Sequence, residues 1–341
     1  MIKKLKIMAK IKKILLTKTD QIDYEKIVRG YSWITKRGQN CILSPDSDGL
    51  LCGLFMSNYL DWRIKGFYDG KIILLDKNIS IKDCIFLDMD IFRKEIRSVG
   101  HHMVQFNKRK KPSSWKNFDN CIQPNNFRNY DGYKDFRLKY PLATIHLLIG
   151  IIGSKIKVTI PKSAICPLFY VDGVFKNLFG YPENCIDWLR YLRADSDKNS
   201  LYDIFFDKHY SVYNLMVALE EFFIQISGID KGKRGNDKIK ISNTKGQPIN
   251  IKTNRDTYEL IQDEKDKARK FLKILSRLTQ WNYKEKSWQW DNFKIYQFSK
   301  STIKPNNKNF EAMIKKKPFS WAMTKGTVIE YTLDSKKIFL K

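Results

Sequence analysis

Short, largely apolar segments of strand length most constrain what this chain can fold into. Residues 41–43 (CIL), 71–76 (KIILLD) and 84–91 (CIFLDMDI) are continuous runs in which apolar and polar residues do not alternate. Such runs are typical of strands buried on both faces, as in a parallel sheet covered by helices. Helical periodicity over residues 50–62 and 140–152 supplies helices between and after these strands. These patterns predict an α/β fold with a parallel sheet.

The chain of 341 residues changes character near residues 195–200. Before this point, residues 164–171 read as a further strand and residues 183–193 as a helix. After it, helical segments lead into a region where aromatic and polar residues alternate, as in strands with one buried face. We therefore expect a basic N-terminal arm or helix over 1–23, an α/β domain with helices on both faces of its sheet over 24–197, and a helical linker with a smaller α+β domain over 198–341.

The charge of the chain indicates the class of partner. Lys and Arg total 63 against 36 Asp and Glu, which gives a formal net charge of +27. With 43% hydrophobic and 13% aromatic residues, the chain is too apolar for a disordered basic tail. An AT-rich genome would explain part of the lysine content, but a lysine bias of that origin usually comes with a matching glutamate bias, which is absent here. A folded protein with this field is expected to bind a polyanion, usually nucleic acid and less often an anionic membrane.

The cysteines and the apolar runs indicate the cellular compartment. None of the six cysteines has C-x-x-C spacing, which argues against a zinc ribbon, and most lie in apolar runs as reduced core cysteines do. The longest apolar run, residues 142–152, is too short to span a bilayer, so no transmembrane segment is expected. The basic N-terminus does not have the pattern of a signal peptide. We expect a cytoplasmic protein.

Three polar clusters follow the strand-like runs, and their residues are Asp46 with Asp48, Asp88 with Asp90, and Gly100 with His101 and His102. In an open parallel sheet the carboxyl ends of the strands meet at one edge, where ligands bind. Carboxylates and imidazoles gathered there suit Mn²⁺ or Mg²⁺. The segment SPDSDG is also typical of a turn with a helix cap, but the order of the three clusters favours metal ligation. Asp90 is expected to be a cap or a supporting group.

At these residues the sequence resembles the DHH phosphoesterase superfamily. That superfamily includes RecJ-like exonucleases, phosphodiesterases for short oligonucleotides and cyclic dinucleotides, and manganese-dependent pyrophosphatases. Residues 44–55 (SPDSDGLLCGLF) resemble its first motif, 86–91 (FLDMDI) its second, and 98–103 (SVGHHM) its third. Residues 169–173 (FYVDG) best match a fourth motif, an aspartate at a strand end. The resemblance covers roughly residues 38–195.

The resemblance implies a site for two Mn²⁺ or Mg²⁺ ions. Asp46 would bind the first ion, Asp48 the second, and Asp88 would bridge them. His101 and Asp172 would complete the site of the second ion. The implied metal ligands are therefore Asp46, Asp48, Asp88, His101 and Asp172. His102 would face the substrate phosphate, so the implied catalytic residues are His102, His101 and Asp88.

Two positions depart from the family pattern. Ile42 stands where the family often has a histidine ligand of the first ion, which leaves occupancy of that site open. Gly100 stands where the family usually has the acid that precedes the two histidines, so a partner for a histidine is missing. Both departures support an alternative, in which a catalytically degenerate module binds nucleic acid within a larger protein complex.

The expected function is metal-dependent hydrolysis of phosphodiester bonds in nucleic acid. Single-stranded DNA or RNA and exonuclease-like cleavage are what the resemblance favours, and the large positive charge favours a long nucleic acid. A basic tract with few acids begins at Asn107, five residues after His102, and its residues Lys108, Arg109, Lys110 and Lys111 are expected to bind the phosphate backbone. The alternative enzyme is a phosphodiesterase for short oligonucleotides or signalling nucleotides.

Overall fold

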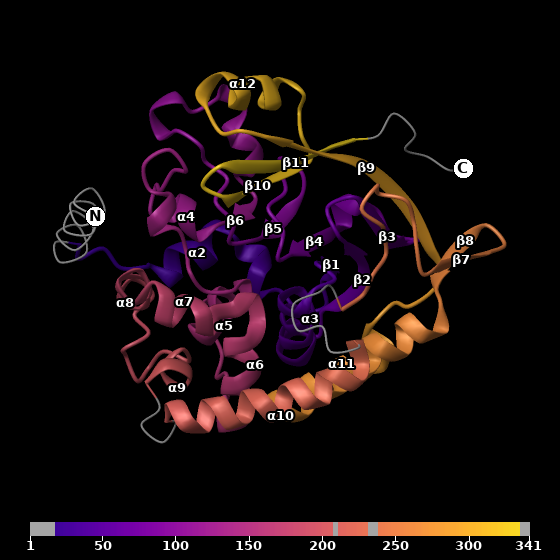
Figure 1. The fold of residues 1–341 in the computed structure, drawn as a ribbon, viewed down its shortest axis with the longest axis horizontal. Helices are drawn as coiled ribbons and strands as arrows, with labels where there is room; N and C mark the ends of the chain where they lie inside the picture. The colour runs from indigo at the N-terminus through magenta and orange to yellow at the C-terminus, as the bar shows by residue number, and fades with distance from the viewer. Residues whose placement is uncertain (1–17, 207–210, 231–237, 335–341) are drawn as a thin grey trace.

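The structure is a computed structural model that describes residues 18–206, 211–230 and 238–334 (Figure 1). Its strands are β1 (Asn40–Leu43), β2 (Arg63–Tyr68), β3 (Ile72–Asp76), β4 (Cys84–Leu87), β5 (Arg97–Val99), β6 (Cys121–Ile122), β7 (Ile251–Asn254), β8 (Thr257–Leu260), β9 (Phe293–Ile303), β10 (Ser320–Lys325) and β11 (Val328–Asp334). Its α-helices are α2 (Tyr24–Gly30), α3 (Ser47–Leu60), α4 (Pro124–Phe127), α5 (Thr144–Gly153), α6 (Ile165–Tyr170), α7 (Val174–Gly180), α8 (Pro182–Tyr191), α9 (Tyr202–Phe205), α10 (Val212–Asp230), α11 (Gln262–Thr279) and α12 (Asn307–Lys315). The α/β class predicted from the sequence is confirmed.

All described strands belong to one sheet with a parallel and an antiparallel part. β2, β1, β4, β5 and β6 are parallel neighbours in that order. β3, β9, β11 and β10 continue the sheet beyond β2 with antiparallel pairing. The prediction that residues 71–76 form a parallel strand is therefore wrong. A short turn at Asp69 and Gly70 joins β2 to β3, and a turn of this length can only connect antiparallel strands.

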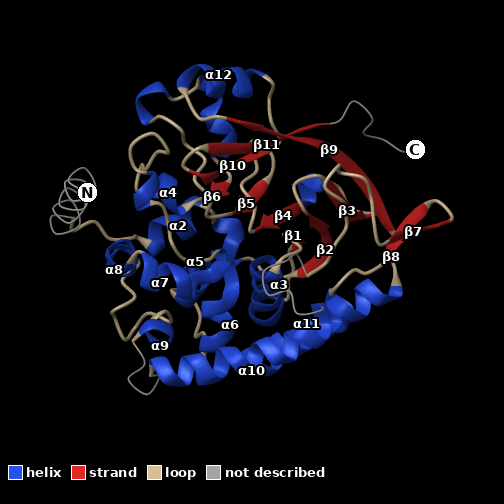
Figure 2. Ribbon diagram, in the orientation of Figure 1, coloured by secondary structure: helices blue, strands red, loops and turns tan. Residues whose placement is uncertain are grey.

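Two buried clusters cover the two faces of the sheet. Side chains of β1 enter the two clusters alternately: Cys41 and Leu43 belong to the larger cluster, and Ile42 belongs to the smaller one. Described α-helices contribute buried side chains to the larger cluster, whereas the buried members of the smaller one come from strands and loops, Phe298 of β9 and Phe319 among them. The expectation of helices on both faces is therefore wrong: on the second face, the C-terminal strands take the place of helices (Figure 2).

The sheet curls so that its last strands reach the loops that carry the polar motifs. β10 forms isolated bridges from Ser320 to Ile91, after β4, and from Met323 to Met103, after the two histidines. The indole of Trp321 also donates a hydrogen bond of 2.7 Å to the carbonyl oxygen of Val104. The C-terminal strands thus lie against the carboxyl ends of the parallel strands.

The segment expected as a strand over residues 164–171 is helical, and that prediction is wrong. It forms α6, followed by a kink at Asp172 and then α7. The run is fully apolar, and an apolar run of this length has the same pattern in a buried strand and in a buried helix. Asp172 therefore comes from a helix–helix junction.

The two parts expected over 24–197 and 198–341 share this sheet, because β9 pairs with β3 along five residues. Side chains from both parts also enter the larger buried cluster. Whether they fold as separate domains stays a prediction. Of the arm expected over residues 1–23, residues 1–17 lie outside the described part of the chain.

One described helix, α10, is long and apolar enough over Val212–Ile229 to cross a membrane by length and composition. In the structure it packs against α6 and α11. Its side chains in the larger buried cluster recur at helical spacing and are Leu215, Leu219, Phe222 and Ile226. A core position thus accounts for part of its apolar character, and we assign no clear transmembrane segment.

Candidate metal centre

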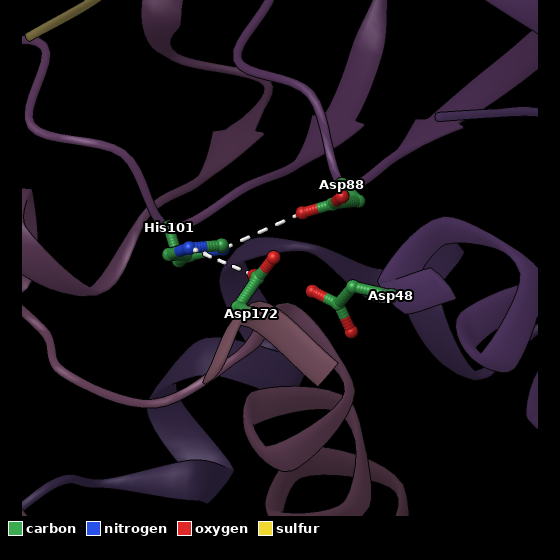
Figure 3. Close-up of side chains that lie close together, drawn as sticks. All are labelled: Asp48, Asp88, His101 and Asp172. Carbon is green, nitrogen blue, oxygen red and sulfur yellow. Dashed lines mark ion pairs between the residues drawn. The ribbon is translucent and has the colours of Figure 1, made fainter. Parts of the chain in front are cut away.

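Four side chains meet beyond the carboxyl ends of the parallel strands: Asp48, Asp88, His101 and Asp172 (Figure 3). Each offers one ligand atom, and these atoms all lie within 4.8 Å of one another. The residues come from the first turn of α3, the end of β4, the loop after β5 and the kink between α6 and α7. Four of the five predicted metal ligands are thus brought together from four separate elements.

The tight junction between β1 and α3 places Asp48. Asp46 is the N-cap of α3, and its Oδ1 accepts a hydrogen bond of 3.0 Å from the backbone nitrogen of Gly49. A β-carbon on Gly49 would collide with the carbonyl oxygen of Ser44, so only glycine lets the helix begin this close to the strand. Asp48 follows in the first turn, where it is fully buried. Asp46 itself lies outside the four-residue group and serves as a helix cap.

Two of the four residues have a left-handed backbone. Asp88 has φ 64° and Asp172 has φ 51°. Aspartate tolerates this region better than most residues with a side chain, although it still carries strain. Such strain is found preferentially at functional sites, where the surrounding structure enforces it. Here the turn out of β4 and the kink after α6 direct these two carboxylates into the cluster.

Thr144 and the start of α5 bind the cluster together, and the sequence motifs did not identify them. The Thr144 hydroxyl donates to Oδ1 of Asp88 at 2.7 Å and lies 2.8 Å from Nδ1 of His101. The backbone nitrogens of Thr144 and Ile145 donate to the two carboxylate oxygens of Asp48 at 2.7 and 3.1 Å. With its hydroxyl hydrogen on Asp88, Thr144 accepts the Nδ1 hydrogen of His101. The other ring nitrogen, Nε2, then presents its lone pair toward Asp172, 3.3 Å away.

The carboxylates of the cluster are crowded and buried. Burial, and after it repulsion from Asp88 and Asp172, raises the pKa of Asp48 well above its ordinary value. Burial, and after it repulsion from Asp46 and Asp172, does the same to the pKa of Asp88. A divalent cation would offset both effects. Three carboxylates and one imidazole are a donor set that fits Mn²⁺ and also suits Mg²⁺.

Two amide side chains hold the backbone of the histidine pair. The Gln123 side chain donates to the carbonyl oxygen of His102, and Asn125 donates to that of His101 at 2.9 Å. Both amides are fully buried, Gln123 at the N-cap of α4 and Asn125 within that helix. The imidazoles of His101 and His102 stack with their centroids 4.5 Å apart. No sequence pattern pointed to these two amides, because their partners are backbone carbonyls more than twenty residues away.

A cleft of about 210 Å³ opens beside the cluster, between the polar motifs and the C-terminal strands. His102, whose side chain is 38% exposed, lines this cleft. Among the described residues, the carboxylates that line the cleft are Asp46, Asp69, Asp88, Asp90 and Glu330. Lys300 of β9 also lines it, and its Nζ lies 2.6 Å from Oε2 of Glu330. This lining repels a phosphate unless cations are bound as well.

The remaining predicted residues lie around this centre. The side chain of Ile42, at the position of the family's histidine ligand, is fully buried in the smaller cluster. The predicted phosphate-binding residues form a short 3₁₀ turn and the residue after it: Lys108, Arg109, Lys110 and Lys111. Nζ of Lys108 is 2.7 Å from Oδ2 of Asp135, while the last three residues are exposed. Their binding to a nucleic-acid backbone stays a prediction.

The chain was compared with models of protein families, with curated proteins and with solved structures. None of them matches it. The resemblance to DHH phosphoesterases therefore rests on the motif residues quoted above.

Proposed function

We propose that this protein is a metal-dependent phosphodiesterase of the DHH type that hydrolyses nucleic acid. The observation that carries the proposal is the convergence of Asp48, Asp88, His101 and Asp172 within 4.8 Å, beside a cleft. These residues were expected at one site from motifs that lie far apart in the sequence. Buried acids with strongly raised pKa values beside a cleft are typical of functional sites.

Asp48, Asp88, His101 and Asp172 would hold a Mn²⁺ or Mg²⁺ ion. When bound, such an ion polarises the phosphate and lowers the pKa of a water molecule, which provides the nucleophile for hydrolysis. Thr144 orients His101 toward the ion and holds the Asp88 carboxylate, and the start of α5 holds Asp48. His102, in the wall of the cleft, contacts the phosphate of the substrate. A second ion, beside Asp46, belongs to the proposal only as an expectation from the family.

The charge distribution supports a nucleic-acid substrate. The net charge is +27, yet the lining of the cleft is mainly acidic. Apart from Lys300, which is paired with Glu330, the cations that attract a polyanion thus lie outside the described lining of the cleft, and Arg109, Lys110 and Lys111 are the exposed candidates close in sequence to His102. The substrate backbone would bind this basic surface, while the scissile phosphate enters the cleft together with the metal ion. Single-stranded DNA or RNA is the preferred substrate in this proposal.

A second candidate function has support from the size of the cleft. At about 210 Å³ the cleft is small, which also suits a phosphodiesterase for short oligonucleotides or signalling nucleotides. Both versions place the protein in the cytoplasm. The six cysteines, all in the described part of the chain, are buried and free, as expected for a reducing compartment.

The test is a panel of labelled substrates incubated with purified protein and Mn²⁺: single- and double-stranded DNA and RNA, dinucleotides, cyclic dinucleotides and pyrophosphate. We expect cleavage of single-stranded nucleic acid that disappears in EDTA and in Asp88→Asn. Asp83→Asn, an exposed carboxylate before β4, is the matched control and should cleave normally. Nucleic-acid binding without cleavage by any of Mn²⁺, Mg²⁺ or Co²⁺ would contradict the enzyme and support a degenerate binding module.

A triple variant separates the long substrate from the short one. Replacing Arg109, Lys110 and Lys111 by Gln should lower the slope of log affinity against log salt for single-stranded DNA by about 2, at roughly 0.7 per phosphate contact. The control is the triple Gln variant of the exposed cations of α11: Lys270, Lys273 and Arg277. Cleavage of dinucleotides should not change in either variant. An unchanged salt slope would mean that the basic tract does not contact the nucleic acid, and it would favour the short substrate.

A further inference from the structure

The glycine in the third motif leaves space that a second acid occupies. Gly100 stands directly before the two histidines, where the family pattern has an acid. A β-carbon on Gly100 would lie 2.5 Å from Oδ1 and 2.6 Å from Cγ of Asp90. These distances are shorter than any ordinary contact, so no residue other than glycine fits at position 100 while Asp90 keeps its place. The carboxylate of Asp90 therefore fills the volume in which a side chain at position 100 would begin.

Asp90 is buried against His102. Its side chain is 2% exposed, and its Oδ2 accepts a hydrogen bond of 3.2 Å from the backbone nitrogen of His102. The same oxygen lies 3.6 Å from Nδ1 of the His102 ring, within ion-pair distance. On the other side, the thiol of Cys121 lies 3.6 Å from Oδ1. Burial, and after it the Asp90 charge, raises the pKa of Cys121 well above its usual range, so this group remains a thiol that donates to the carboxylate.

We propose that Asp90 is a positioning residue that orients His102. Asp90 belongs to the second motif, and it takes the place of the acid that the third motif lacks because Gly100 stands there. That His102 acts on the substrate is part of the proposed function, and this proposal rests on it. With Nδ1 next to the Asp90 carboxylate, Nδ1 is the protonated nitrogen and Nε2 lies on the opposite side of the ring. The ring is held in the wall of the cleft by Asp90 on one side and by stacking against His101 on the other.

This arrangement changes what the Gly100 departure means. At the level of sequence, the missing acid supports a degenerate site, because a histidine without an oriented partner is a poor participant in catalysis. In the structure, the carboxylate of Asp90, ten residues earlier, lies where that acid would begin. It fits there only because Gly100 has no β-carbon. A substitution at Gly100 should therefore damage the site by displacing Asp90, although glycine itself contacts no substrate.

Three variants test the proposal: Asp90→Asn, Gly100→Ala, and the relocation variant that combines Asp90→Gly with Gly100→Asp. The first readout is independent of activity and of metal: ¹⁵N NMR of the His102 imidazole, identified by its loss in His102→Gln. The native chain should show the Nδ1–H tautomer. Asp90→Asn and Gly100→Ala should shift His102 toward the ordinary Nε2–H form, and the relocation variant should restore Nδ1–H. Asp83→Asn is the matched control and should leave the tautomer unchanged.

The second readout is kinetic and uses single-stranded DNA with Mn²⁺. Asp90→Asn and Gly100→Ala should lower kcat by about 10- to 100-fold, as for other partners of functional histidines, while Mn²⁺ affinity changes by less than threefold. The relocation variant should recover at least a tenth of the native kcat. An Nε2–H tautomer in the native chain, or a full kcat in Asp90→Asn, would overturn the proposal. If the native chain neither binds Mn²⁺ nor cleaves, the proposed function fails, while the NMR result still decides whether Asp90 orients His102.

Discussion

At the scale of single residues, Thr144 contacts two candidate metal ligands, although it belongs to none of the sequence motifs. One hydroxyl group connects Asp88 and His101, two of the four residues in the candidate metal centre. The same residue begins α5, whose first two backbone nitrogens hold both oxygens of Asp48. Three of the four candidate ligands are therefore oriented by one residue and the peptide that follows it. Partners of this kind typically matter almost as much as the ligands themselves.

Thr144→Val should weaken Mn²⁺ binding by about 10- to 100-fold, because valine has the same shape but no hydroxyl to bridge Asp88 and His101. Thr144→Ser keeps the hydroxyl and should bind within about threefold of the native affinity. Isothermal titration calorimetry measures both, and thermal melting in EDTA checks that the variants are folded. Equal affinities of the Val and Ser variants would mean that the hydroxyl has no part in ion binding.

The raised pKa of Asp88 predicts how the ion-free protein responds to pH. Between the ordinary pKa of aspartate, 3.8, and the raised value, the folded chain keeps a proton that the unfolded chain has lost. The free energy of unfolding therefore falls as the pH rises through this interval. Asp88→Asn lacks this contribution, so its stability relative to the native chain should grow with pH. Urea unfolding in EDTA at several values between pH 4.5 and 8 measures the difference.

Saturating Mn²⁺ should reverse that order, because the ion binds the native carboxylates and stabilises the folded state by mass action. The native chain with Mn²⁺ should then be more stable than Asp88→Asn at pH 8. A stability difference that stays constant across pH in EDTA would contradict the burial argument for Asp88.

At the scale of elements, the junction of β1 and α3 decides whether the first motif becomes a site. The helix begins so close to the strand that Gly49 faces the Ser44 carbonyl without room for a β-carbon. Gly49→Ala must push α3 away from β1 or break the cap made by Asp46. Either movement carries Asp48 away from the start of α5 and from the other ligands.

Gly49→Ala should therefore cost about 1–3 kcal/mol of stability, the usual range for overpacking, and should also abolish tight Mn²⁺ binding. Gly70→Ala, at the β2–β3 turn, is a useful comparison because it has a left-handed φ of 80° but open space around it. We expect it to destabilise the fold while Mn²⁺ affinity is retained. Urea unfolding and calorimetry on both variants separate the two effects, and normal Mn²⁺ binding by Gly49→Ala would refute the argument.

At the scale of the whole molecule, the sheet joins both halves of the chain. β9 covers the edge of β3, and the long α11 packs against α3. Phe55 of α3 contacts Trp281 with ring centroids 4.9 Å apart, and Gly53 faces the ring of Trp288. Residues far apart in the sequence thus build one core behind the candidate centre.

A chain cut to residues 1–197 should therefore fail to fold cooperatively, because the cut exposes the edge of β3 and removes the tryptophans that pack on α3. Thermal melting followed by circular dichroism tests this, with the full chain as reference. Co-expression with residues 198–341 should recover a soluble complex that melts cooperatively. A cooperative transition of 1–197 alone would instead support the separate domains expected from the composition.

The sequence and the tertiary structure contributed different parts of this picture. The α/β class and the strands at β1 and β4 follow from local patterns, since continuous apolar runs and helical periodicity are set by neighbouring residues. The helical state of residues 164–171 was missed, because an apolar run has no period that separates a buried helix from a buried strand. The antiparallel direction of β3 depends on its short turn from β2, and β2 (RIKGFY) has no continuous apolar run that would mark it as a strand.

By itself, the sequence determined the residue types of the candidate metal centre and their order along the chain: Asp48, Asp88, His101 and Asp172. Only the tertiary structure decided that these four side chains meet and that Asp46 stays apart as a helix cap. It also brought Thr144 next to His101 and Asp90 next to His102. The physical reason is that ligation and orientation depend on contacts between residues tens of positions apart, whereas a sequence pattern records only the local preference of each segment for helix, strand or turn.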